Sequence, residues 1–560
     1  MKKSLPIGIS DFKKLRDRNC YYIDKTLMIK EVIDSKVEVI LLPRPRRFGK
    51  TLNLSMLKYF FEKSENDYSY LFKDLDINNK TECMEYQGKY PVISLTFKDI
   101  KDRDWSNSFQ KIKRLLIEEY ERHSYIIECL SAGEQKYYHT IVMGEAEQSE
   151  YEISLRYLTK FLKRYHQENV MILIDEYDAP IQSGYLNGYY QEIISFMRNF
   201  LSGGLKDNSA LEKGILTGIL RVAKESIFSG LNNLSVYSLL KPHFNQYFGL
   251  LIEEVENFLN YYDLEESSKE VKEWYNGYLF GGETVYNPWS VIKYVENRGV
   301  PEMFWVNTSG NDLVKEIIAQ GIEIKEDLEL LLNNQSIKKK IFENIIYDEI
   351  QDNTDSIWSF FLFSGYLKAQ IRERKRGSLY CELKIPNREV LYLFEDIIVS
   401  WFKNNIKNKE VNLLLKSLIT GDITTFEKIF RNLVDSAFSY FDTSGNQSEN
   451  FYHAFVLGLL VNLREDYQVN SNRESGLGRY DVMLIPNDSE KLGIVMEFKQ
   501  VDQYEGEDLD SAVKKALEQI EEKNYRQELV DTGCQQILEL GLAFAGKRVK
   551  IKHRMIRKYE

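Results

Sequence analysis

The chain has 560 residues, of which 43% are hydrophobic and 28% charged, so it can bury a core of ordinary size. Its formal net charge of −11 argues against a protein that coats nucleic acid non-specifically, although it allows a local basic channel. The five cysteines lack metal-binding spacing, the N-terminus lacks an apolar signal core, and no apolar run approaches the ~20 residues that span a bilayer. We therefore expect a cytoplasmic protein with reduced thiols and, at roughly 100–200 residues per domain, about three or four domains.

Residues 37–51 join an apolar, strand-like run to a basic loop, and a helical pattern follows directly. The loop ends in Gly49-Lys50-Thr51, where the glycine allows the backbone to approach a phosphate closely. The next amides would lie at a helix N-terminus, where free N–H groups and the helix dipole favour an anion. Lys50 is placed to reach the β- and γ-phosphates of a nucleotide, and the Thr51 hydroxyl to ligate Mg²⁺. The segment predicts a phosphate-binding loop.

The match to the general pattern G-x-x-x-x-G-K-[ST] is incomplete. Arg44 stands where the pattern has its first glycine, and Pro45 lacks an N–H that could bind phosphate. Arg46 and Arg47 follow, and we expect both to serve the phosphate site of their own subunit. Taken alone, the segment also fits a basic surface turn that contains Gly-Lys-Thr.

A second segment supports nucleotide binding. Residues 170–174 form an unbroken apolar run, typical of a strand buried on both faces, and Asp175 and Glu176 follow it. In a phosphate-loop ATPase the first acid after such a strand associates with Mg²⁺, and a second acid can polarise the attacking water. We interpret Asp175 as the Mg²⁺-associated group and Glu176 as the catalytic base. Solvated acids at a strand end are the alternative, but a phosphate loop on the same chain makes that less favoured.

Further strand patterns at residues 91–97 and 214–219 alternate with helical patterns, which predicts a parallel α/β sheet through about residue 235. The end of the last strand would lie beside the phosphate loop. Thr217 could there sense the γ-phosphate, and Arg221 could neutralise its charge. A solvated basic loop explains Arg221 equally well.

Residues 236–441 are rich in aromatic residues and helical patterns, and we interpret them as a helical lid or connector. Rings beside turn residues, as at 274–278 and 286–289, more often mark packing corners than ligand cages. The polar run at residues 442–450 is the clearest linker candidate.

A second group of polar residues lies near the C-terminus. Asp481 begins one strand pattern, and Glu497 and Lys499 end the next. Strand side chains alternate faces, so Glu497 and Lys499 should point the same way while Met496 and Phe498 face the core. Two acids from neighbouring strands can hold a hard divalent cation, and a lysine beside them can orient water and stabilise charge on a phosphate. This arrangement suits cleavage of a phosphodiester, whereas an edge hairpin with polar residues facing water is the plain alternative.

The chain resembles bacterial proteins that join an AAA-ATPase-like domain to a C-terminal PD-(D/E)XK nuclease-superfamily domain. The resemblance covers nearly the whole length, and the arginine-rich phosphate loop without its first glycine is that family's own form. It is carried by the motifs at residues 8–12, 22–26, 44–52, 173–178, 274–278, 286–289, 307–311, 363–367 and 385–387. The resemblance implies an α/β fold with an N-terminal phosphate-loop ATPase parallel sheet (1–235), a helical middle region (236–441) and a C-terminal PD-(D/E)XK-like α/β domain (449–560).

The resemblance also implies roles for individual residues. In the nuclease core Asp481 and Glu497 would bind metal, Lys499 would act on water, Glu449 would be the first-helix acid and Gln519 an accessory residue. ATP and Mg²⁺, with Mn²⁺ as an alternative, are the expected cofactors. The nucleotide and its metal would be held by Arg46, Arg47, Gly49, Lys50, Thr51, Asp175 and Arg221.

Three functions remain open at this level. The first is an ATP-regulated, metal-dependent nuclease, and the second is a nucleotide-switch ATPase whose C-terminal domain binds nucleic acid without cutting it. The third is an interaction scaffold in which neither site turns over. We expect the partner to be nucleic acid, DNA in preference to RNA, and we expect no association with a membrane. A homo-oligomer is possible at this level. Seven lysines and arginines among residues 547–558 could flank the nuclease cleft, although a solvated terminal strand is the commoner meaning of such a run.

Overall fold

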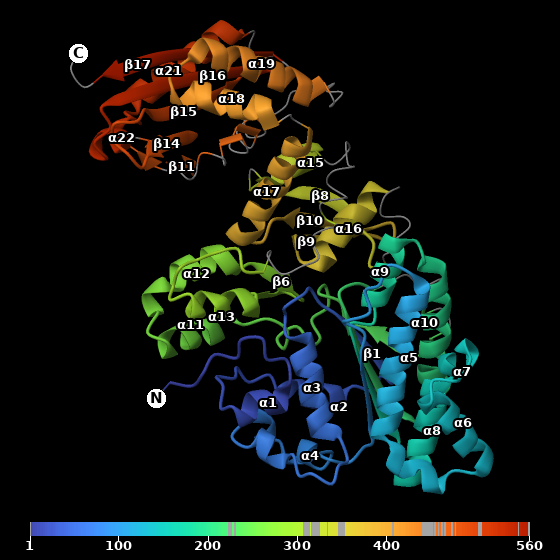
Figure 1. Ribbon diagram of the computed structural model, residues 1–560. Coiled ribbons are helices and arrows are strands. Elements are labelled where there is room, and N and C mark those ends of the chain that lie inside the picture. Colours follow the sequence, from blue (N-terminus) through green and yellow to red (C-terminus); the bar gives the residue numbers. More distant parts are fainter. Residues whose placement is uncertain are drawn as a thin grey trace. The chain divides into compact units, whose positions relative to one another are not determined.

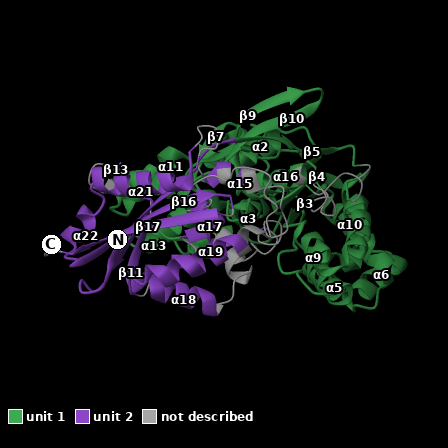
Figure 2. Cartoon of the chain, turned by 90° about the horizontal axis from the view of Figure 1, so that it is seen from above, with its two compact units in different colours: residues 1–309, 337–390 green, residues 310–336, 391–560 purple. Residues whose placement is uncertain are grey.

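The computed structural model describes residues 2–221, 227–228, 231–305, 325–332, 334–344, 353–405, 408–439, 466–471, 474–475, 478–501, 507–546 and 548–557. Residue 314 and a few residues between 452 and 463 are also described. The chain forms two compact units (Figure 2). Unit 1 comprises residues 1–309 and 337–390, and unit 2 comprises residues 310–336 and 391–560. Among the described residues, no helix has the length and apolar character needed to cross a membrane.

Unit 1 is built on a five-stranded parallel sheet with the order β2-β3-β4-β1-β5. The strands are β1 (Val39–Pro43), β2 (Val92–Thr96), β3 (Val170–Asp175), β4 (Leu211–Gly218) and β5 (Leu234–Val236). Every residue of β1 and β3 is buried, as the unbroken apolar runs predict for strands covered on both faces. The predicted parallel sheet is therefore confirmed.

Helices cover both faces of this sheet. Figure 1 shows α2 (Leu27–Asp34) and α3 (Lys50–Phe61) on one side, and α5 (Trp105–Arg122), α8 (Ser154–His166) and α10 (Tyr190–Leu205) on the other. Shorter helices complete this part of the unit: α1 (Phe12–Asp17), α4 (Thr81–Met84), α6 (Ala132–Val142), α7 (Gln148–Glu152) and α9 (Ala179–Asn187).

The rest of unit 1 combines helices with two small antiparallel sheets. Helices α11 (Ile252–Tyr261), α12 (Ser268–Tyr275) and α13 (Pro288–Glu296) enclose an aromatic core that includes Phe258 and Tyr275. A hairpin of β6 (Tyr278–Phe280) and β7 (Glu283–Val285) lies between α12 and α13 in the sequence. The second sheet has the order β8-β10-β9, from β8 (Ile337–Ile341), β9 (Lys368–Lys375) and β10 (Ser378–Lys384), with α16 (Thr354–Ser364) preceding β9. The region that we expect to be helical thus also contains these strands.

Unit 2 contains a five-stranded mixed sheet with the order β11-β14-β15-β16-β17, in which only β15 and β16 run parallel among the described strands. Its strands are β11 (Tyr467–Ser471), β14 (Val482–Pro486), β15 (Gly493–Gln500), β16 (Gln536–Ala545) and β17 (Arg548–Arg557), and a short hairpin pairs β12 (Glu474–Ser475) with β13 (Gly478–Arg479). The helices are α15 (Lys325–Leu332), α17 (Arg388–Asn405), α18 (Asn408–Ile419), α19 (Ile423–Ser439), α21 (Leu509–Glu522) and α22 (Gln527–Asp531). The first residues of α17 belong to unit 1.

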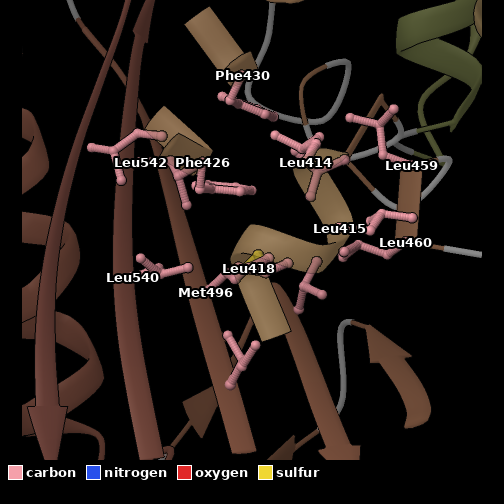
Figure 3. Close-up of a cluster of buried hydrophobic side chains, with 14 of the residues drawn as sticks. Leu414, Leu415, Leu418, Phe426, Phe430, Leu459, Leu460, Met496, Leu540 and Leu542 are labelled. Atoms are coloured by element: carbon pink, nitrogen blue, oxygen red, sulfur yellow. The ribbon is translucent and has the colours of Figure 1, made fainter. Parts of the chain in front are cut away.

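The two faces of this sheet bury different residues. On one face, Met496, Leu540 and Leu542 pack against leucines of α18 and phenylalanines of α19 (Figure 3). On the other, Val495 and Ile537 pack against residues of α21 and α22. Because neighbouring residues of a strand face opposite ways, Met496 and Phe498 lie in the first core, and Glu497 and Lys499 are directed to the α21 side.

Candidate nucleotide and nuclease sites

The phosphate loop connects β1 directly to α3. Gly49 caps the helix in the left-handed region, with φ of 85°, and Arg47 also has a positive φ of 66°. A Cβ on Gly49 would meet no atom within 4 Å, so the backbone conformation and not lack of space favours glycine there. The first amides of α3 have no carbonyl partner within the helix, which suits them to an anion.

The Lys50 side chain lies inside the curl of this loop. Its Nζ donates hydrogen bonds to the carbonyls of Arg44, at 3.0 Å, and Pro45, at 2.9 Å. Burial lowers the pKa of Lys50, while the nearby carboxylates of Glu176 and Asp175 act in the opposite direction. The ammonium is thus fixed beside two carboxylates at the centre of the loop.

Asp175 connects the loop to the sheet. The Thr51 hydroxyl donates to one carboxylate oxygen of Asp175 at 2.6 Å, and the Thr217 hydroxyl donates to the other at 2.6 Å. The strand order explains this arrangement, because β4, which carries Thr217, lies between β1 and β3. The structure therefore brings together the two residues predicted to associate with Mg²⁺.

Glu176 follows Asp175 in an unusual conformation. Its φ is 50°, a left-handed value that costs a non-glycine residue on the order of 1–3 kcal/mol and is concentrated at functional sites. The next amide, that of Tyr177, donates to the Thr217 carbonyl at 3.1 Å and so holds the turn. Glu176 lines a cavity beside the loop, whereas the Asp175 oxygens accept hydrogen bonds from Thr51 and Thr217.

We call this cavity the basic cavity; its volume is about 400 Å³. Six predicted residues line it: Arg46, Arg47, Gly49, Lys50, Thr51 and Glu176. Lys98 and Lys101, which follow β2, and Trp289, in the first turn of α13, also line it, together with the N-terminal segment at residues 6–10. Sequence patterns did not single out these lysines, although they follow a strand of the same parallel sheet and so reach the same edge as Asp175.

The arginines near this cavity differ in their surroundings. The Arg47 guanidinium lies 4.5 Å from the centre of the Trp289 ring, in a cation–π contact, and the Arg46 guanidinium donates to the Gln182 side chain at 3.3 Å. Arg221 is half-buried, burial lowers its pKa, and it is not among the described residues that line the basic cavity. Its contact with phosphate stays a prediction.

Arg44, at the position of the missing glycine, is completely buried. Its guanidinium donates to the carbonyls of Pro43 and Tyr237, at 2.8 and 2.6 Å, and lies 4.9 Å from the centre of the Phe248 ring. Burial lowers the pKa of Arg44 to about 9, and the charge of Glu31 opposes this shift. The Arg44 side chain therefore fills the space behind the loop and binds backbone carbonyls there, and it does not line the basic cavity.

A smaller apolar cavity, of about 90 Å³, adjoins the basic cavity. Its walls include Tyr21, Tyr22 and Phe258, with Lys25 as the charged residue. Gly49, Leu52 and Pro288 line both cavities, so the two are contiguous beside the phosphate loop. Apolar walls with aromatic rings can take a flat base.

The second site lies in unit 2, at the ends of β14 and β15. Lys499 Nζ donates to Glu497 Oε1 at 3.1 Å, so these two side chains point the same way, as strand alternation predicts. Asp481 immediately precedes β14, and its carboxylate accepts a hydrogen bond from the Phe498 amide at 2.7 Å. Burial raises the pKa of Asp481, and the charge of Lys499 opposes that shift. Asp481, Glu497 and Lys499 therefore come together.

Gln519 of α21 reaches the same neighbourhood through Tyr525. Its side-chain amide donates to the Tyr525 hydroxyl at 3.1 Å. Burial raises the pKa of Tyr525, and the charges of Glu497 and Asp481 add to the shift. Glu449, and the linker candidate at residues 442–450, lie outside the described residues.

The donor chemistry of this site fits a hard divalent cation. Asp481 and Glu497 offer carboxylate oxygens, which are the ligands that Mg²⁺ and Mn²⁺ prefer. Within the described part of the chain, no group of three or more acidic, histidine or cysteine side chains is placed to hold a metal. Mg²⁺ commonly uses one or two carboxylates and keeps several waters or substrate phosphate oxygens, so two carboxylates suffice.

Three basic side chains of β17 form ion pairs with acids of α21. Arg554 forms an ion pair with Glu521 at 2.7 Å, and Lys550 and Lys552 both pair with Asp510. Part of the basic C-terminal run is therefore ion-paired, and each of these three side chains already has an acidic partner.

Comparisons with known proteins agree with this organisation. Residues 6–228 match a family model described as a predicted AAA-ATPase, and residues 447–554 match the PD-(D/E)XK nuclease superfamily. The chain is also 26% identical over 538 residues to an uncharacterized protein in the vnfD 5′ region of Azotobacter chroococcum mcd 1, covering 94% of this chain and 93% of that relative.

Proposed function

Because the chain joins an AAA-ATPase-like domain to a PD-(D/E)XK nuclease-superfamily domain, we propose that it is an ATP-regulated, divalent-metal-dependent nuclease. In this proposal residues 1–235 bind and hydrolyse ATP, residues 236–441 form the lid and connector, and residues 449–560 cleave nucleic acid, with DNA as the expected substrate.

The observation that carries the nucleotide site is the bridging of Thr51 and Thr217 by the Asp175 carboxylate, at 2.6 Å on each side. Thr51 and Asp175 would hold Mg²⁺, which when bound neutralises charge on the phosphate oxygens. Lys50 supplies a fixed positive charge to the β- and γ-phosphates, and Arg46 and Arg47 add charge at the cavity wall. The apolar cavity beside Gly49 is a suitable place for the base.

Hydrolysis needs a group that accepts a proton from the attacking water. Glu176 is suited to this role because it lines the basic cavity with Lys50 and Thr51, while the Asp175 oxygens accept hydrogen bonds from Thr51 and Thr217. The two neighbouring acids would thus have different roles. Asp175 would associate with the metal ion, and Glu176 would accept the proton from water.

In unit 2, Asp481 and Glu497 would hold the divalent cation, which when bound activates water and stabilises charge on the phosphate. Lys499, which donates to Glu497 at 3.1 Å, can orient that water or neutralise the phosphodiester. Gln519 and the Tyr525 hydroxyl form a second polar group that can position the nucleic-acid backbone.

The proposal is tested on the purified full-length protein with labelled single- and double-stranded DNA and RNA. Reactions contain Mg²⁺, Mn²⁺ or EDTA, and no nucleotide, ADP or ATP. Discrete products that require the cation and are absent with EDTA support nuclease activity. Nucleic acid that the protein shifts on a native gel but leaves uncut under every condition would instead support the alternative, a nucleotide-switch ATPase that binds nucleic acid without cleaving it.

A further inference from the structure

The back of the phosphate loop is held by Trp305. The Trp305 indole N–H donates to the Arg46 carbonyl at 3.1 Å, and the Trp305 side chain is buried. In a trans peptide the carbonyl and the following N–H point in opposite directions. Anchoring the Arg46 carbonyl therefore fixes the direction of the Arg47 amide, within the part of the loop that lines the basic cavity.

Trp305 is in turn held by Glu389. The Glu389 side chain is fully buried, and its carboxylate accepts hydrogen bonds from the Trp305 amide, at 2.5 Å, and from the Ser290 hydroxyl, at 2.8 Å. Ser290 is the residue after Trp289, whose ring makes the cation–π contact with the Arg47 guanidinium. A buried carboxylate that loses its hydrogen-bond partners costs the folded state free energy. The positions of Trp305 and Ser290 relative to Glu389 are therefore energetically favoured over alternatives.

The packing around Trp305 leaves the loop little freedom to move alone. The Tyr366 ring lies 5.2 Å from Trp305, centre to centre. Gly365, with φ of 92°, packs so tightly on Pro45 that a Cβ there would lie 2.8 Å from the proline Cβ. Close-packed interiors transmit displacement, so a shift of residues 45–46 must be shared by Trp305 and its neighbours.

Trp305 and Glu389 also stand next to places where the chain passes between the two units. Unit 1 ends at Ser309, shortly after Trp305, and again at Val390, the residue after Glu389. Glu389 is the second residue of α17, a helix whose residues from Leu391 onward belong to unit 2. A displacement of the first turn of α17 therefore acts on the helix that continues into the sequence of unit 2.

We propose that Trp305 and Glu389 are positioning residues that couple the phosphate loop to α17, and so transmit nucleotide binding toward the unit that carries the nuclease domain. This inference rests on the proposed function and names how its regulation operates. The order of the coupling is Arg46 carbonyl, Trp305 indole, Trp305 amide, Glu389 carboxylate and the first turn of α17.

The direct test is hydrogen–deuterium exchange of the full-length protein with and without Mg²⁺ and a slowly hydrolysed ATP analogue. Trp305→Phe removes the indole donor while keeping an aromatic ring, and Trp274→Phe is the matched control on α12. In the wild type and in Trp274→Phe, nucleotide should change exchange in the first turns of α17 at least about threefold. In Trp305→Phe this change should disappear, while nucleotide affinity, measured by calorimetry, falls by no more than about tenfold, as for one lost neutral hydrogen bond.

A second pair of variants separates coupling from folding. Glu389→Gln keeps an acceptor for the Trp305 amide and should retain part of the exchange response, whereas Glu389→Leu should lose it. Nucleotide binding accompanied by the same α17 response in Trp305→Phe and wild type would overturn the coupling and leave the proposed function intact. A wild-type protein that binds no nucleotide would contradict the proposed function itself, which calorimetry distinguishes.

Discussion

The guanidinium of Arg44 donates a hydrogen bond to the carbonyl of Tyr237 at 2.6 Å, although the two residues are far apart in the sequence. Arg44 occupies the position at which the general phosphate-loop pattern has glycine. Its burial shows that the departure from the pattern is a structural feature of the loop, because the side chain fills the space behind it and satisfies backbone carbonyls.

Restoring the general pattern should therefore harm the protein. Arg44→Gly removes a buried side chain and leaves the carbonyls of Pro43 and Tyr237 without their donor, which should lower the free energy of unfolding of unit 1 by about 2–4 kcal/mol. Arg47→Gly is the matched control, because Arg47 is exposed and has φ of 66°, a value that glycine adopts freely. Thermal unfolding should show a clear loss for Arg44→Gly alone; equal losses in both variants would contradict the structural role of Arg44.

Lys50 should be essential for nucleotide affinity. Lys50→Ala removes the charge fixed inside the loop, and calorimetry with Mg²⁺ and ATP should show binding weakened at least about 100-fold. Lys58→Ala is the control, because Lys58 lies two turns further along α3 and is not among the described residues lining the basic cavity. Wild-type affinity in Lys50→Ala would show that the loop is not a phosphate site.

Glu176 should affect catalysis and spare binding. Glu176→Gln keeps the shape of the side chain but removes the proton acceptor, so kcat for ATP hydrolysis should fall by about 10²–10⁴-fold with little change in nucleotide affinity. Asp99 supplies another carboxylate on the same cavity wall, and Asp99→Asn should retain hydrolysis. The opposite pattern in the two variants would assign the base to Asp99.

The two acids of the second site should differ from the lysine. Asp481→Asn and Glu497→Gln should each abolish calorimetric Mn²⁺ binding and cleavage, because both remove a charged oxygen ligand. Lys499→Ala should slow cleavage but leave Mn²⁺ bound, since an ammonium does not ligate a cation. Glu518→Gln, on the exposed side of α21, is the control. Retention of wild-type Mn²⁺ affinity by both acid variants would exclude this metal site.

Glu119 should make the stability of unit 1 depend on pH in the acidic range. Burial alone would raise the pKa of Glu119, but the charge of Arg122, the neighbouring His123 and the hydrogen bonds from Arg122 outweigh it and lower the pKa to about 2. The carboxylate also accepts from the Ser94 amide at 2.8 Å and so ties α5 to β2, the strand that precedes Lys98.

Because the pKa in the folded state lies below the ordinary ~4.3, the stabilisation from Glu119 is present above pH ~4 and is lost as pH falls toward 2. Glu119→Gln should therefore lower the free energy of unfolding of unit 1 by up to about 3 kcal/mol at pH 7, and by about half as much near pH 3. Denaturant titrations at the two pH values measure the difference. An equal loss at both would contradict an electrostatic origin.

Local patterns predicted the phosphate loop, the acidic strand end and the Asp481, Glu497 and Lys499 group, because each depends on residues close in sequence and on strand alternation. The partners of Arg44 could not be predicted in this way, since Tyr237 and Phe248 reach it only through the fold. Lys98 and Trp289 were missed for the same reason: their place at the cavity follows from the strand order and from the packing of α13. The sequence pattern also could not show that Asp510 and Glu521 of α21 pair with three basic residues of β17, because those partners reach the strand only through the fold.

The most direct test of the central claim compares cleavage by wild type, Lys50→Ala and Asp481→Asn with Mg²⁺ or Mn²⁺, each with and without ATP. The wild type should form discrete products at a rate that ATP changes, Lys50→Ala should cut at one rate regardless of ATP, and Asp481→Asn should not cut. Wild-type protein that cuts no nucleic acid under any of these conditions, or cleavage that persists in Asp481→Asn, would contradict an ATP-regulated nuclease.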